Sequence, residues 1–113
     1  MELELEIETR DDLVKPFEIG VPMKLSDDAD LVYKGPVLMK GHVELGQILR
    51  FVVHAAENLD GALLAQALYD NLRGTFREIT SITVNTTTVI TTIDKDSFQQ
   101  TITQVIKESR TKQ

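Results

Sequence analysis

The chain has 113 residues and a mass of 12.7 kDa, with 42% hydrophobic and 27% charged residues. This length suits one small domain, and this composition excludes disordered, collagen-like and low-complexity chains. The chain contains no cysteine, which excludes disulfides, zinc–thiolate sites and a thiol nucleophile. We therefore expect a single domain over residues 1–113, with a frayed tail at 110–113.

The net charge of −6 is concentrated at the beginning of the chain. Residues 1–30 hold ten acidic and three basic side chains, a net −7, whereas the remaining residues hold eight acidic and nine basic ones, a net +1. Such an acidic segment repels nucleic acid and attracts basic surfaces. The sequence shows neither a signal peptide nor a run of about 20 apolar residues. We therefore expect a cytoplasmic, prokaryotic protein with no membrane partner.

The first segment is the clearest strand of the sequence. Residues 1–8 alternate apolar side chains with glutamates, which is typical of a half-buried β-strand whose acidic face meets water or basic neighbours. Residues 17–25 are apolar but interrupted by Gly20 and Pro22, so an irregular strand is expected there. The run of serine and aspartates at 26–30 predicts a turn.

The next two segments leave more than one structure open. Residues 31–39 form a second apolar run, and the Gly-Pro pair within it indicates an edge strand, a bulge or two short pieces. In residues 43–57, polar side chains recur every three or four positions, at Glu44, Gln47, Arg50, His54 and Glu57. This spacing favours a helix. As a strand, the same segment would place Arg50 and His54 on one face with Ile48 and Val52.

The second half of the chain predicts two helices around a threonine-rich strand. Residues 60–73 have leucines every fourth position, Asp60 as a cap for the first turn, and Gly74 as a left-handed C-terminal residue. Residues 79–93 are β-branched almost throughout and lack glycine. We therefore favour one long strand over a hairpin turning at residues 85–86. Residues 95–109 form the last helix.

These elements predict an α+β fold in which an antiparallel or mixed sheet of three to five strands packs against two or three helices. The expected core collects the apolar side chains that repeat with the period of their element. Its members are Leu3, Leu5, Ile7, Val37, Val52, Leu64, Leu68, Leu72, Ile82, Val84, Ile90, Phe98 and Ile102.

Residues that carry chemistry are sparse. His54 and Glu57 would share a helix face, where a carboxylate could orient an imidazole, and His42 lies in a nearby turn. A metal site needs three or four ligands, and no third ligand stands at helical spacing. The aspartates at 27–30 lack the glycine and the closing glutamate of a calcium loop. We accordingly predict no catalytic residue, no metal and no cofactor, and an enzyme is the less favoured class.

The function that this sequence favours is a non-catalytic protein–protein interaction or oligomerisation module, with a homo-oligomer or another protein as partner. Apolar side chains outside the best-packed helical stripe would form its interface, and they are Phe51, Val53, Leu63 and Tyr69. The first alternative is a small-ligand-binding or hydrolytic domain that uses His54 and Glu57. The second is a nucleic-acid-associated regulator that binds through the basic C-terminal end, although acidic neighbours make nucleic acid a poor partner.

Overall fold

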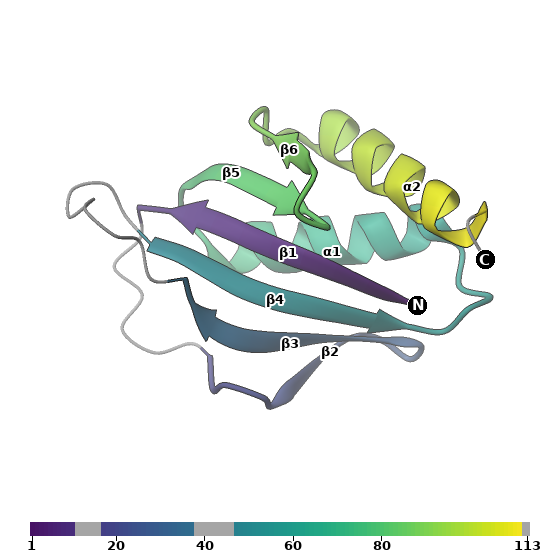
Figure 1. Ribbon diagram of the computed structural model, residues 1–113, viewed down its shortest axis with the longest axis horizontal. Coiled ribbons are helices and arrows are strands. Elements are labelled where there is room, and N and C mark those ends of the chain that lie inside the picture. The colour runs from purple at the N-terminus through teal and green to yellow at the C-terminus, as the bar shows by residue number, and fades with distance from the viewer. Residues whose placement is uncertain (11–16, 38–46, 112–113) are drawn as a thin grey trace.

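In the computed structural model, which describes residues 1–10, 17–37 and 47–111, the chain forms one antiparallel sheet and two helices. The six strands and two helices are β1 (Glu2–Thr9), β2 (Pro22–Ser26), β3 (Ala29–Pro36), β4 (Gln47–Ala55), α1 (Gly61–Thr75), β5 (Ile79–Val84), β6 (Thr88–Ile90) and α2 (Lys95–Thr111). The strand order is β2-β3-β4-β1-β5-β6 (Figure 1). The predicted α+β class is confirmed, but the sheet has six strands rather than three to five.

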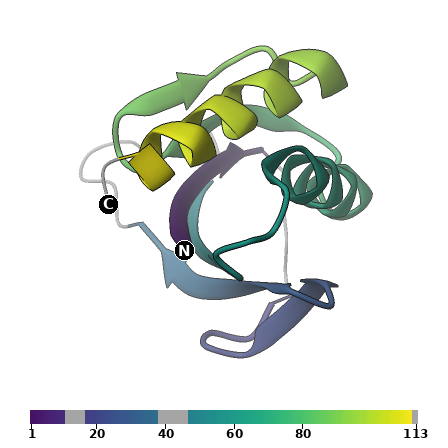
Figure 2. The same cartoon turned by 90° about the vertical axis from the view of Figure 1, so that its right-hand side faces the viewer.

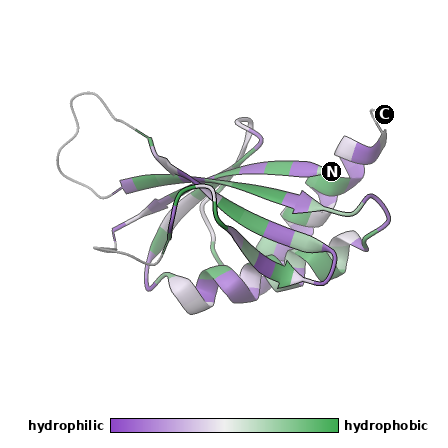
Figure 3. Cartoon of the chain, turned by 90° about the horizontal axis from the view of Figure 1, so that it is seen from below, coloured by the Kyte–Doolittle hydropathy of each residue, from purple (hydrophilic) through white to green (hydrophobic). Residues whose placement is uncertain are grey.

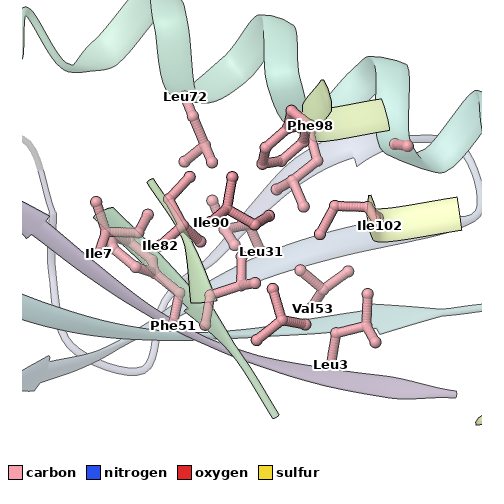
Figure 4. Close-up of a cluster of buried hydrophobic side chains, with 14 of the residues drawn as sticks. Leu3, Ile7, Leu31, Phe51, Val53, Leu72, Ile82, Ile90, Phe98 and Ile102 are labelled. Carbon is pink, nitrogen blue, oxygen red and sulfur yellow. The ribbon is translucent and has the colours of Figure 1, made fainter. Parts of the chain in front are cut away.

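The hydrophobic core lies between one face of the sheet and both helices. Alternation along β1 turns Leu3, Leu5 and Ile7 inward, where each is at most 1% exposed. The sheet curves toward the helices, and side chains of α1 and α2 meet those of the strands (Figures 2 and 4). All the predicted core residues are buried except Val37 and Val52, which are half-buried.

The predicted helix at 43–57 is wrong, because residues Gln47–Ala55 form β4 (residues 43–46 lie outside the described part of the chain). β4 pairs with β1 on one side and with β3 on the other. Its odd-numbered residues Leu49, Phe51 and Val53 enter the core. Ile48, Val52 and Val53 are β-branched, so they lose side-chain freedom in a helix and pack well in a strand. Pairing of this strand on both sides overrides the helical spacing of the polar residues.

The single long strand predicted for 79–93 is also wrong. β5 and β6 form a hairpin, in which the Thr87 N–H donates to the carbonyl oxygen of Val84 at 3.2 Å. Asn85 and Thr86 have φ values of 51° and 64°, and a type I′ turn requires positive φ at both central residues. Asn85 also bonds Glu4 twice, since its N–H donates to the Glu4 carbonyl and its Oδ1 accepts from the Glu4 N–H.

The first half of the sheet differs from the prediction in its bounds. The irregular strand expected at 17–25 is reduced to β2, and residues Asp27 and Asp28 form the turn that leads into β3. The pairing of β3 with β4 shifts register between Tyr33 and Gly35, which confirms a bulge beside the Gly-Pro pair. β3 is not an edge strand, because β2 pairs with its outer side.

The helices begin as predicted and end later than predicted. Asp60 caps α1, and its Oδ1 accepts the Ala62 N–H at 2.8 Å. α1 continues through Gly74, whose φ is not positive, so the expected left-handed end there is wrong. Arg110 belongs to α2 and donates to the Leu59 carbonyl oxygen, so it is not frayed. Neither helix among the described residues has the length and hydropathy to cross a membrane.

Candidate functional site

The face of the sheet opposite the helices carries most of the charged strand residues, and we call it the open face. Strand alternation places there the side chains of Glu2, Glu4, Glu6 and Glu8 from β1, Ile48, Arg50, Val52 and His54 from β4, Asp30, Val32 and Lys34 from β3, Ser81 and Thr83 from β5, and Val89 from β6. Both helices of the described chain pack on the other face. Polar and apolar residues alternate along its strands (Figure 3).

The register of the strands sets which side chains of the open face are neighbours. Glu6 of β1 lies directly opposite Arg50 of β4 on one side and opposite Thr83 of β5 on the other. One row further along, Glu4 lies opposite Val52. Side chains opposite each other on one face stand about 5 Å apart at their Cβ atoms, so these residues form one continuous patch.

This patch encloses a pocket of about 340 Å³. Six polar residues line it, from four strands and the turn after β5: Glu4, Glu6, Lys34, Arg50, Thr83 and Thr86. β1 supplies two carboxylates, whereas the cations come from β4 and β3. In the described part of the chain, none of these four charged side chains takes part in an ion pair or a hydrogen bond.

Two departures from regular β-structure border this pocket. Lys34 occupies the bulge in β3, between the pairs Tyr33–Phe51 and Gly35–Arg50, and Gly35 has a φ of 103°. Thr86 is β-branched and yet has a φ of 64°, a conformation that costs such residues about 1–3 kcal/mol. Bulges re-aim side chains next to binding sites, and residues held in unfavourable conformations also gather there.

The predicted partnership of His54 with Glu57 does not form. His54 lies on the open face at the end of β4, and its Nδ1 is 3.2 Å from Oε1 of Glu2. Glu57 follows the strand and its Oε1 lies 3.0 Å from the amino group of Met1. No group of three metal-ligating side chains occurs in the described ranges, and His42 lies outside them.

The four predicted interface residues do not share a surface. Phe51 and Val53 are buried in the core, at 1% and 0% exposed, so the expectation that they lie outside the packed stripe is wrong. Leu63 is 59% exposed on α1. Tyr69 is half-buried, with its ring centroid 5.5 Å from that of Phe98.

Comparison with family models, with curated proteins and with solved structures found no match to this chain. The site therefore rests on its own geometry. No local motif joins the six polar pocket residues, because strand pairing brings them together from segments as distant as residues 4 and 86. One signal was available: the strand alternative for 43–57 places Arg50 on a face with Val52, as β4 does.

Proposed function

We propose that this protein is a non-catalytic interaction module that docks another protein on its open face. One observation carries the proposal: in the described chain both helices pack on the same face of a six-stranded sheet, and neither packs on the other face. Ile48 and Val52 remain half-buried there among charged neighbours. Apolar positions inside a charged rim are typical of protein interfaces.

The charge of the open face selects the kind of partner. The strands β1, β3 and β4 present five carboxylates and two cations on it, with four glutamates along β1 alone. Two copies stacked face to face would bring these glutamate rows toward each other, which disfavours the homo-oligomer. A partner with a basic docking surface has the complementary charge, and its association rate would fall as salt rises.

The substitution Ile48→Lys tests this docking. Ile48 lies opposite Glu8, so a lysine there finds an intramolecular counter-charge and leaves the sheet intact, while it repels a basic partner. Leu63→Lys on α1 is the matched control, since Leu63 is exposed on the helical side. Partners captured by the wild type are purified and their affinity is measured by titration calorimetry for each variant.

We expect Ile48→Lys to weaken binding by at least about tenfold, because it places a like charge in the interface, and Leu63→Lys to leave binding unchanged. Equal affinities for both variants would refute docking on the open face. If native mass spectra show a dimer for the wild type and a monomer for Ile48→Lys, the partner that docks on the open face is a second copy of the chain and not a basic protein.

A further inference from the structure

We infer that the pocket on the open face binds a small dipolar ligand of the amino-acid class, one that carries both a carboxylate and a cationic nitrogen. This pocket lies within the open face and shares Val52 with the proposed docking surface, but Ile48, the position that tests docking, does not line it. The inference rests on the charges of the pocket, on their lack of partners within the chain, and on the backbone that positions them.

The pocket has walls of opposite charge. Glu4 and Glu6 form an acidic wall on β1, while Arg50 and Lys34 form a basic wall on β4 and β3. The planar guanidinium of Arg50 suits a carboxylate, to which it can donate two parallel hydrogen bonds. The two glutamates accept hydrogen bonds from an ammonium group.

A ligand of single charge meets one favourable wall and one repulsive wall. An anion held by Arg50 and Lys34 would lie beside two carboxylates, and a cation held by the glutamates would lie beside two cations. Like charges brought together in this way lower affinity. A dipolar ligand pairs with both walls at once, so the pocket favours a ligand that carries both charges over one that carries a single charge.

The charged groups of the pocket are available to a ligand. Glu6 and Arg50 lie directly opposite each other on neighbouring strands, an arrangement in which opposite charges ordinarily pair. Nevertheless, no ion pair joins them, and none engages Glu4 or Lys34, within the part of the chain that the structure describes. Binding therefore breaks no intramolecular ion pair.

At both ends of the pocket the backbone departs from regular β-structure. The bulge in β3 places Lys34 beside Arg50, and the Asn85–Thr86 turn holds Thr86 at the other border with a positive φ. Between them run β4 and β1, two adjacent central strands (Figure 1). Two paired strands below the pocket and an irregular backbone on either side of it are the arrangement of a preformed ligand site. The volume of the pocket, about 340 Å³, is at the small end of the range for such sites.

Three forms of one dipeptide test the inference by nuclear magnetic resonance titration of the full chain. Alanylalanine carries both charges, N-acetyl-alanylalanine only the carboxylate, and alanylalanine amide only the ammonium group. We expect saturable shifts for the dipolar form at the backbone amides of β1, β4 and the Asn85–Thr86 turn. Each singly charged form should bind about tenfold more weakly, as expected for the loss of one charge-assisted contact.

Two variants assign each end of the ligand. Arg50→Gln should abolish the preference for the dipolar form over the amide, and Glu6→Gln should abolish its preference over the N-acetyl form. Lys107→Gln and Asp70→Asn remove the same charges from exposed positions on α2 and α1, and both should bind as the wild type does. All four positions lie at the surface or half-buried, and circular dichroism verifies that each variant folds.

The inference would be overturned if alanylalanine gave no saturable shifts up to about 10 mM, because a dissociation constant above that concentration is far weaker than that of ordinary ligand sites. Equal binding of the three dipeptide forms would also overturn it, and so would equal loss of binding in the helix controls. The Ile48→Lys experiment reports on docking alone, so a failure of either proposal is distinguishable from a failure of the other.

Discussion

Replacing Thr86 by glycine should stabilise the protein. Thr86 has a φ of 64°, which costs a β-branched residue about 1–3 kcal/mol, and its side chain is exposed. Glycine adopts this conformation without a Cβ penalty, but it loses more backbone entropy on folding, about 0.5–1 kcal/mol. The difference predicts a gain of about 1 kcal/mol in the free energy of unfolding, or about 4 °C in the melting temperature of a domain of this size.

Urea unfolding measures this change. The midpoint of Thr86→Gly should rise while the slope of free energy against urea stays constant. Thr87→Gly is the matched control, because Thr87 is also exposed and its φ is not positive. That variant should lose about 0.5–1 kcal/mol through glycine entropy alone. If both glycines destabilise the protein equally, the positive φ of Thr86 stores no strain and the reasoning fails.

Further predictions concern single groups whose surroundings are well defined. Asp60→Ala removes the N-cap of α1, so the free energy of unfolding in urea should fall by about 1 kcal/mol. Asp60→Asn should keep most of the cap's stabilisation, because asparagine also caps helices well. Gly74→Ala should raise that free energy by about 0.5–1 kcal/mol, because Gly74 lies within α1 and a methyl group there meets open space. Burial raises the pKa of Tyr33, so the folded state retains its phenolic proton to a higher pH than the unfolded state. The resulting stability is complete below about pH 10 and is lost as pH rises through the folded pKa, and Tyr33→Phe should remove this part of the alkaline slope in thermal melts.

Elements with strong local periodicity could be predicted from the sequence. The alternation of β1 and the leucine spacing of α1 identified their types and their buried faces, because in both cases the period of the element matches one apolar face. β4 could not be identified in this way. Its polar residues fit a helical stripe, and the decisive stabilisation comes from its pairing with strands on both sides.

The β5–β6 hairpin shows how a non-local contact replaces a local signal. No glycine marks the turn, yet Asn85 adopts a positive φ and exchanges two hydrogen bonds with Glu4, a residue 81 positions earlier. Asparagine tolerates this conformation better than other side-chain-bearing residues do. The residues next to the turn include no glycine, and they do not reveal Glu4, the hydrogen-bonding partner on β1.

Two irregularities of the sheet lie at the border of the candidate pocket. Lys34 lies in the bulge that the Gly-Pro pair indicates, and Thr86 lies in a turn that its own sequence disfavours; both line the same pocket. Foldable sequences are locally consistent, and departures from consistency concentrate where function demands them. A regular sheet could have supplied the same glutamates and Arg50 at lower cost, but it would not have placed a second cation at one border and a threonine at the other. The positions of these irregularities therefore support a site that evolved for binding over a surface that is charged only for solubility.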